Sequence, residues 1–193
     1  LLSQNGEIQI TTNESSQINP VIYDSLIVWM DLRHQSGFTP DAKIYMYDLT
    51  TEMESVVDYF PYHQSSPDVW QHRIVWQERN NIYMYDLLQG ENITICSASG
   101  TQSFPKIDGN YIVWHDDRSS SNTDIYLFDI AGDSIVQITD DTEIRQEYPD
   151  VSGNLVIWLQ NDSLYVHDLT EGTTSPVHTE YEPQDPAISG KNI

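Results

Sequence analysis

The chain has 193 residues, of which 30 are Asp or Glu and only 8 are Lys or Arg, so its formal net charge is −22. This balance argues against nucleic-acid binding, which needs clustered cations, and against binding to anionic membrane surfaces. No apolar run approaches the ~18 residues of a membrane-spanning helix, so we expect no membrane insertion. The single cysteine, Cys96, cannot form an intrachain disulfide, and its apolar neighbours favour burial.

One pattern occurs four times along the chain. A proline is followed by a tight turn, a run of Ile and Val that ends in Trp, and then a Tyr-x-aromatic-Asp segment or a close variant of it. The tryptophans of the four copies are Trp29, Trp76, Trp114 and Trp158, which are 47, 38 and 44 residues apart. Short strands that repeat every 40–45 residues are typical of β-propeller blades.

The elements predicted in chain order are all strands. Residues 7–12 alternate between polar and apolar residues, which predicts the outer strand of a partial blade within residues 1–12. Four complete four-stranded units follow at about 19–57, 66–96, 104–139 and 148–178, and a fifth begins within 185–193. The first strand of each unit is expected to start at its proline: Pro20, Pro67, Pro105 and Pro149. No window has a helical period, so we predict an all-β class and one antiparallel β-propeller domain or segment over 1–193.

Several recurrent residues have a local explanation. Proline is tolerated on an edge strand, and the innermost strand of a propeller blade is such an edge. Aspartates after the third strand should accept hydrogen bonds from the backbone of the following turn: Asp48, Asp86, Asp129 and Asp168. Glutamines recur three residues before the prolines, and Gln184 is displaced by one: Gln17, Gln64, Gln102 and Gln146. We expect these glutamines to join neighbouring blades by hydrogen bonds rather than to bind a ligand.

These repeats resemble the TolB-like propeller repeat, which is also called the WD40-like or PD40 repeat. Pro149-Asp150 followed by Ser152-Gly153 carries the resemblance, as does the acidic residue two positions after Trp with a nearby Arg, seen in Asp31-x-Arg33 and Asp116-x-Arg118. The version found here is most similar to repeats of archaeal and bacterial cell-surface proteins. The resemblance implies a ring of six or seven blades that serves protein–protein contact or adhesion. We therefore expect the remaining blades to come from a longer chain, or from a partner or self-association.

A loop-rich face is the predicted interaction surface. The connections between second and third strands are long in units one and three and short in units two and four, which indicates a duplicated two-blade unit. They should share one face with the links between units. Aromatic and charged residues on that face are the candidate partner-binding residues: Tyr59, Tyr62, His63, Arg145 and Tyr148. The expected partner is a protein or a cell-surface glycan, and the alternative is a solvated rim.

The sequence offers little catalytic chemistry. The six histidines have no short ligand spacing, and neither a Gly-x-Ser-x-Gly elbow nor a phosphate-binding glycine loop is present. Asp116 and Asp124 could supply oxygen ligands to calcium, although a salt bridge from Asp116 to Arg118 is the favoured interpretation. We expect a non-enzymatic module without a required cofactor.

Two other functions remain open at this point. One is a propeller-fold enzyme or accessory domain, namely a polysaccharide lyase or hydrolase or the lid of a peptidase. The other is a structural spacer in a surface layer. We expect an extracellular, cell-surface or periplasmic location, which three glycosylation sequons that begin at Asn13, Asn92 and Asn161 support weakly.

Overall fold

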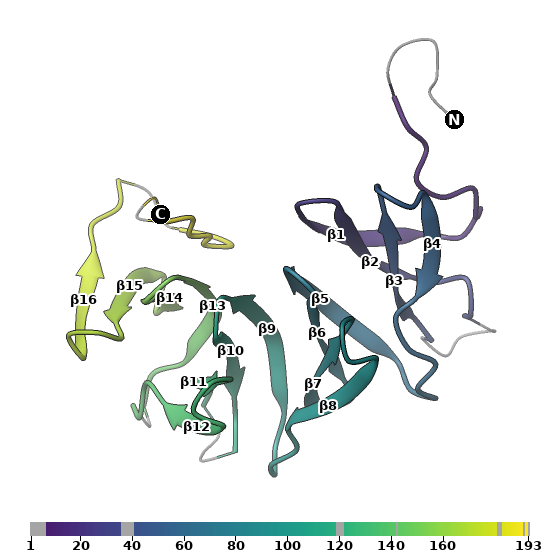
Figure 1. Ribbon diagram of the computed structural model, residues 1–193. Helices are drawn as coiled ribbons and strands as arrows, with labels where there is room; N and C mark the ends of the chain where they lie inside the picture. Colours follow the sequence, from purple (N-terminus) through teal and green to yellow (C-terminus); the bar gives the residue numbers. More distant parts are fainter. Residues whose placement is uncertain are drawn as a thin grey trace.

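The computed structural model describes residues 7–35, 41–118, 122–141, 143–180, 183–190 and 192. These residues form strands β1 to β16 and no helix, which confirms the all-β class. The strands make four antiparallel sheets of four consecutive strands each. The sheets follow one another around an arc, with the first strand of each sheet on the inside and the fourth on the outside (Figure 1). This is the predicted propeller architecture with four complete blades.

The blades have the following strands. The first contains β1 (Gln17–Tyr23), β2 (Leu26–Asp31), β3 (Lys43–Asp48) and β4 (Met53–Val56). The second contains β5 (Gln64–Trp70), β6 (Arg73–Glu78), β7 (Asn81–Asp86) and β8 (Glu91–Cys96). The third contains β9 (Gln102–Asp108), β10 (Tyr111–Asp116), β11 (Asp124–Asp129) and β12 (Ser134–Gln137). The fourth contains β13 (Gln146–Ser152), β14 (Leu155–Gln160), β15 (Ser163–Asp168) and β16 (Thr173–Val177).

The sequence predicts second and third strands at 26–31 and 43–48 in the first unit, and in all four units these strands agree with the structure to within one residue. Two other predictions were wrong. Each first strand starts at the glutamine, three residues before the proline, because a bulge carries the strand through the proline. Residues 7–12 do not form the predicted strand, and only Ile8 takes an isolated bridge position. An outer strand needs the third strand of its own sheet as a ladder partner, as β4 has in β3.

The four tryptophans occupy equivalent and buried positions. Trp29, Trp76, Trp114 and Trp158 are each at most 3% exposed. Each ring stacks on the tyrosine opposite it on the third strand, with ring centroids 6.0–6.2 Å apart: Tyr45, Tyr83, Tyr126 and Tyr165. Cross-strand aromatic pairs of this kind stabilise a sheet and orient both rings toward one face.

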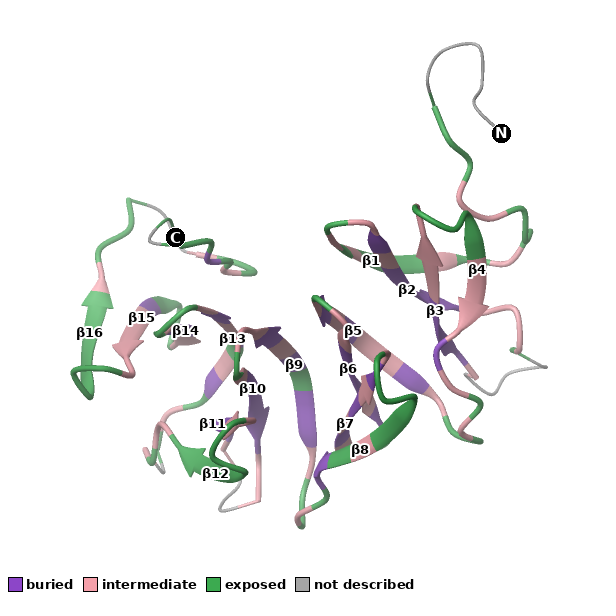
Figure 2. Cartoon of the chain, viewed as in Figure 1, coloured by how far each residue is buried: buried purple, intermediate pink, exposed green. Residues whose placement is uncertain are grey.

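The core lies between the blades. Val69, Ile74 and Trp76 of the second blade pack against the first blade, where Val28 and Ile44 are fully buried. The same contact recurs with the tryptophans of the third and fourth blades. Burial is concentrated in the inner parts of each sheet, whereas the outer strands β12 and β16 are exposed (Figure 2). Each blade therefore covers the apolar face of its neighbour.

In the first and third blades, the tryptophan, the aspartate two residues later and the following arginine form a hydrogen-bonded group, which we call the clasp. In the third, Asp116 Oδ2 accepts hydrogen bonds from Trp114 Nε1 at 2.9 Å and from Arg118 Nη2 at 2.5 Å. This confirms the predicted Asp116–Arg118 salt bridge. Burial alone would raise the pKa of Asp116, but the hydrogen bonds from Arg118 and Trp114 outweigh it and lower the pKa. The fourth blade has Gln160 at the equivalent position and lacks this clasp.

Hydrogen bonds from three of the four predicted glutamines join the blades, whereas the Gln17 side chain donates to Ser15 O just before its own strand. The backbone N–H groups of Gln64, Gln102 and Gln146 each donate to a carbonyl of the preceding blade at 2.9 Å. Gln64 Oε1 also accepts the N–H of Ile44 at 2.8 Å, and Gln146 Oε1 accepts the hydroxyl of Thr139 at 3.2 Å. All three glutamine side chains are completely buried. The predicted aspartates also accept hydrogen bonds from their turns.

Aspartates on the inner strands make a second connection between blades. Asp68 Oδ2 accepts the N–H of Ile107 in the next blade at 2.8 Å. Asp150 Oδ2 accepts the N–H of Ile188 at 2.9 Å, so the segment near the C-terminus contacts the fourth blade in the same way. Burial raises the pKa of Asp68 to about 6, against the opposing influence of Lys106 and the Ile107 N–H. The folded chain therefore disfavours ionisation of this carboxyl group.

We expect the substitution Asp116→Ala to lower the free energy of unfolding by about 2–4 kcal/mol, because it leaves the Trp114 indole N–H and the Arg118 guanidinium without their acceptor. Urea unfolding at an unchanged m-value measures this loss. Gln160→Ala at the equivalent position of the fourth blade is the matched control and should cost under ~1 kcal/mol. Equal losses in the two variants would contradict the role of the clasp.

Asp68→Asn should change how stability depends on pH. Since the folded pKa of Asp68 is raised from 3.8 to about 6, ionisation makes unfolding easier as the pH rises through this window. The asparagine keeps an oxygen for the Ile107 N–H and cannot ionise. Relative to wild type, we expect the variant to gain about 1–2 kcal/mol between pH 4 and pH 8, a value reduced for partial solvent contact.

Urea unfolding at both pH values measures the gain from Asp68→Asn. Asp133→Asn, in the exposed turn before β12, is the control. A stability difference that stays constant with pH, or the same pH trend in the control, would show that burial of Asp68 does not set the effect.

Candidate functional site

A left-handed residue before the proline of each inner strand, and one before Pro186, shapes the inner surface of the arc. These residues all have left-handed backbone conformations, with φ between 47° and 55°: Asn19, Ser66, Phe104, Tyr148 and Asp185. In β1, β5, β9 and β13 the pairing register shifts at this point. Proline has no N–H for the ladder, so a bulge accommodates it without leaving a donor unpaired. Four of these five residues line one cavity, and Tyr148 does not.

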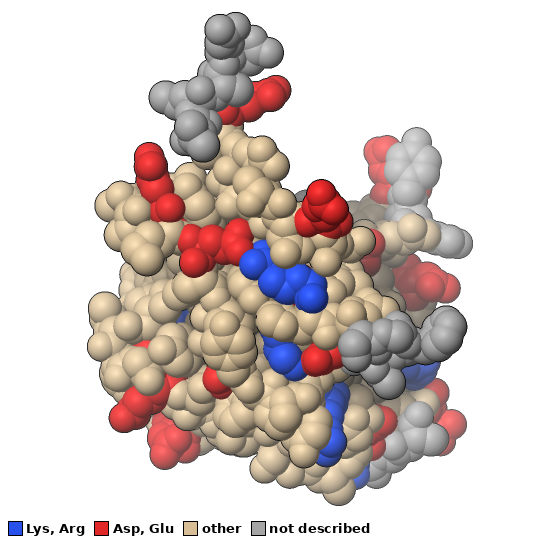
Figure 3. Space-filling model, turned by 90° about the vertical axis from the view of Figure 1, so that its right-hand side faces the viewer, with Lys and Arg blue, Asp and Glu red and all other residues tan. Residues whose placement is uncertain are grey.

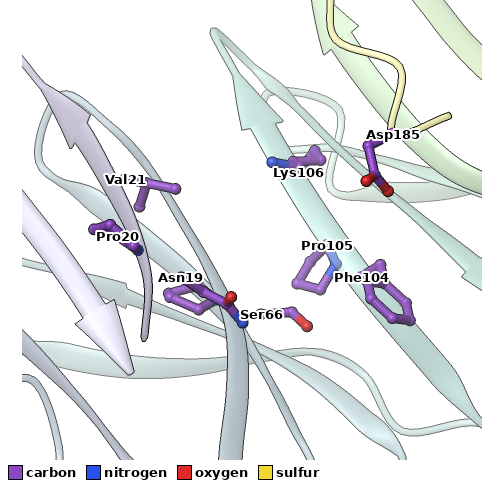
Figure 4. Close-up of a pocket in the computed structure, with 9 residues that line it drawn as sticks. Asn19, Pro20, Val21, Ser66, Phe104, Pro105, Lys106 and Asp185 are labelled. Atoms are coloured by element: carbon purple, nitrogen blue, oxygen red, sulfur yellow. The ribbon is translucent and has the colours of Figure 1, made fainter. Parts of the chain in front are cut away.

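The bulges of the first three blades border an open cavity of about 330 Å³ on the inner side of the arc, the axial cavity. Its lining residues come from three blades and from the segment near the C-terminus: Asn19, Pro20, Val21, Ser66, Pro67, Phe104, Pro105, Lys106 and Asp185. The side chains converge on a common space although the strands that carry them are far apart in sequence (Figure 4). The cavity has a polar side at Asn19 and Ser66, and an aromatic side at Phe104.

An aromatic cluster continues the wall between the third and fourth blades. Phe104 lies 5.0 Å from the His115 ring and 5.4 Å from the Tyr148 ring, measured between centroids. Phe104 and Tyr148 are 42% and 39% exposed, while His115 is buried. Burial, assisted by Arg145, lowers the pKa of His115 to about 4, so its ring is neutral at physiological pH. The partly exposed rings of Phe104 and Tyr148 therefore pack against the buried and neutral ring of His115.

Three of the predicted partner-binding residues lie together on the link between the first and second blades. Tyr59 is 72% exposed, and Tyr62 is 42% exposed beneath the Arg79 guanidinium, 3.2 Å from the ring centroid. His63 Nδ1 accepts the backbone N–H of Ala42 at 3.1 Å. Burial and the nearby Lys43 lower the pKa of His63, which favours the neutral ring that this hydrogen bond requires. Tyr59 and Tyr62 thus form the accessible part of this group.

The other two predicted residues lie on the fourth blade. Arg145 is exposed and pairs with Glu147 at 2.6 Å, whereas Tyr148 belongs to strand β13 rather than to a loop. No hydrogen bond, ion pair or ring contact between described residues joins Arg145 or Tyr148 to the tyrosines of the first link. The structure therefore places the five candidates in two separate groups.

Charged side chains of both signs are mixed on the side of the molecule formed by the first blade. Lys and Arg lie beside Asp and Glu across this face (Figure 3). Arg33 pairs with Asp31 at 2.8 Å and with Glu54 at 2.6 Å, and Lys43 pairs with Asp41. Arg33 and Lys43 are therefore both paired with carboxylates of the first blade.

Sequence reasoning did not identify the axial cavity. Asn19, Ser66, Lys106 and Asp185 were not among the candidates, and Tyr148 was assigned to the loop face. The available signal was the recurrent proline, because its missing N–H is tolerated in a strand only at an edge, at the first residue or at a bulge.

The calcium candidates lie opposite each other. Asp116 and Asp124 are register partners across β10 and β11. Asp116 is held in its clasp, and Asp124 accepts a hydrogen bond from Gln137 Nε2 at 3.2 Å. Within the described parts of the chain, no group of three or more His, Cys, Asp or Glu residues is placed to hold a metal ion. In the same parts, no helix is long and apolar enough to cross a membrane.

Comparisons with known proteins identify the fold. No family model matches the sequence, and no curated protein matches it. The structure is similar to a putative TolB from Agrobacterium tumefaciens (TM-score 0.60, 17% identity, covering 79% of this chain and 60% of that one). It is also similar to TolB from Acinetobacter baumannii (TM-score 0.62, 17% identity, 90% and 46%) and to the computationally designed Ika8 protein (TM-score 0.64, 14% identity, 93% and 54%).

The described arc corresponds to part of each of these structures. The chain spans 60% and 46% of the two TolB chains and 54% of the designed protein. At 14–17% sequence identity, these similarities concern the fold alone. Together with the four antiparallel blades, the comparisons show that this chain has a TolB-like β-propeller fold.

Proposed function

We propose that this chain is a non-enzymatic cell-surface or periplasmic module that binds a protein partner through its exposed aromatic residues. The observation that carries the proposal is the exposure of Tyr59, Tyr62 and Tyr148, at 72%, 42% and 39%. The blade tryptophans, by contrast, are buried in the scaffold. Tyrosine combines a large apolar surface with a hydrogen-bonding group and few rotatable bonds, which makes it frequent at the centres of protein interfaces.

The rigid scaffold supports this role. Tyr148 sits on a bulge of β13 and packs against Phe104 and His115, so little side-chain freedom remains to be lost on binding. Tyr59 meets His34 edge to face at 6.4 Å and is oriented by it. Both aromatic groups are therefore preorganised, although they belong to different blades. A partner that contacts both must be a macromolecule rather than a small ligand.

We favour binding over catalysis because of the groups at the axial cavity. Seven of its nine lining residues are Asn, Ser, Pro, Val or Phe, which do not titrate, and the other two are Lys106 and Asp185. Acid–base and nucleophilic chemistry needs unlike reactive groups that converge. A mostly apolar wall with a few polar groups is better suited to hold a ligand or a segment of a partner.

The test uses capture of partners from a detergent extract of the source organism's cell envelope. We expect the immobilised chain to retain a protease-sensitive partner, and the double variant Tyr59→Ala, Tyr148→Asn to lose at least ~10-fold of it. Asparagine is chosen because the first blade carries Asn19 at the equivalent left-handed position, so the backbone remains compatible. Leu88→Ala, at a 77% exposed residue in the turn after β7, is the matched control.

Each other outcome of the capture experiment contradicts the proposal in a specific way. Retention of material that resists protease but is released by glycosidases would identify a glycan partner. Equal capture by wild type and the double variant would exclude the aromatic residues as the binding surface. The absence of any captured material would favour a structural spacer.

We further propose that the module needs no calcium. Both oxygens of Asp116 already accept hydrogen bonds from Trp114 and Arg118, and calcium would have to displace them. We expect millimolar calcium and EDTA to give melting temperatures within ~2 °C of each other, since a ligand stabilises only the state it binds. A rise of several degrees with calcium that disappears in Asp124→Asn would overturn this expectation.

A further inference from the structure

We propose that Asn13, Asn92 and Asn161 are acceptor sites for N-linked glycans, and that the glycan at Asn92 shields the edge strand β8. The proposal goes beyond partner binding, but it rests on the proposed location outside the cytoplasm. Each asparagine begins an Asn-x-Ser/Thr sequon with Glu, Ile or Asp in the middle position. The structural question is whether the folded chain leaves the asparagines and their hydroxyl partners free to carry a glycan.

All three asparagines are exposed. Asn13 precedes β1 in an irregular segment, where its Oδ1 accepts the N–H of Ser15 at 2.9 Å. Asn161 is in the two-residue turn between β14 and β15. None of the three lines the axial cavity. A glycan at any of them would therefore project outward without opening the core.

The strand geometry at Asn92 places the acceptor and its hydroxyl on one side. In β8, Asn92 and Thr94 are exposed while Ile95 and Cys96 are buried. Residues two apart in a strand point to the same face, so the Asn92 amide and the Thr94 hydroxyl share one face of the blade, beside their register partners Tyr85 and Tyr83. Asn92 Nδ2 donates a hydrogen bond to Asp58 Oδ2, which holds the acceptor amide at the surface.

The edge position of β8 gives the modification a physical role. Among the described strands β8 pairs only with β7, so its other edge has no ladder partner there. It has six residues, against four in β4 and β12 and five in β16, and β16 contains Pro176. Long edge strands without proline invite pairing with another chain, and natural sheets protect them with charges or bulky cover. A hydrophilic glycan at Asn92 would supply that cover.

The transfer balances with one co-reactant, a lipid-linked oligosaccharide diphosphate. The asparagine Nδ2 attacks the anomeric carbon of the first sugar and forms the N–C bond. The C–O bond to the diphosphate breaks, and the lipid diphosphate leaves with the bonding electron pair. One amide proton passes to a base of the transferase, so no oxidant or reductant is needed.

The test is glycopeptide mass spectrometry of the protein purified from the envelope of its source organism. We expect sugar-bearing peptides at the three sequons. The matched controls are Asn110 and Asn154, which are exposed in hairpin turns but have Ile112 and Val156 at the position of the hydroxyl residue. Both controls should be unmodified.

Substitutions at residue 94 test the shielding of β8. Thr94→Val keeps a β-branched side chain and removes the hydroxyl, so occupancy of Asn92 should fall at least ~10-fold. Thr94→Ser should retain occupancy. At equal concentration, the Thr94→Val protein should also associate faster in light scattering than the glycosylated Thr94→Ser protein, because both carry an altered strand but only one carries the glycan.

The remaining outcomes overturn the proposal. Envelope protein with bare sequons, or with sugar on Asn110 or Asn154, would refute the acceptor sites and leave the proposed surface location intact. Modified Asn13 and Asn161 with a bare Asn92, or equal association of the two variants at residue 94, would refute the shielding of β8. Recovery of the protein only from the cytoplasm would instead refute the proposed function on which the location rests.

Discussion

The structure depends on the burial of the tryptophan faces of the second, third and fourth blades by the blade that precedes each. A four-stranded sheet has two faces, and in each blade both are too apolar to remain in water. Trp76 and Trp114 lie at interfaces of this kind and are fully buried. An indole removes roughly 150–250 Å² of surface from water, so these contacts outweigh any single polar interaction in the fold. The glutamine and aspartate hydrogen bonds then set the register in which one blade meets the next.

Much of this architecture follows from local sequence. The Ile-Val-Trp and Tyr-x-aromatic-Asp segments have strand periodicity and fixed turn residues, so β2, β3 and their counterparts could be located to within a residue. The Asp116–Arg118 pair was also predictable, because residues two apart in an extended segment share a face. The inner strands were predicted to start three residues too late, because the proline was interpreted as the first residue of the strand. In the structure it follows a bulge within the strand. Nothing in the local pattern shows that a strand passes through its proline.

The candidate site was less predictable than the fold, for a physical reason. The positions of Tyr59 and Arg145 depend on how neighbouring blades are oriented, and this orientation is set by packing across the whole interface. Loop residues could therefore be named but not grouped. The axial cavity depends on left-handed backbone at Asn19, Ser66 and Phe104, which their residue types do not demand. The burial of His115 and the half-burial of His63 likewise arise from tertiary contacts that a sequence pattern does not contain.

The bulges also explain how one repeat can serve many purposes. Asn, Ser, Phe, Tyr and Asp all occupy the same left-handed position, so the backbone there tolerates a change of chemistry. The residues that hold the blades together are elsewhere, at the tryptophans and glutamines. Mutations can consequently change the residues that line the inner surface one blade at a time, while the residues that stabilise the fold stay the same. Such a division of labour would let gene duplication produce new specificities from an unchanged scaffold.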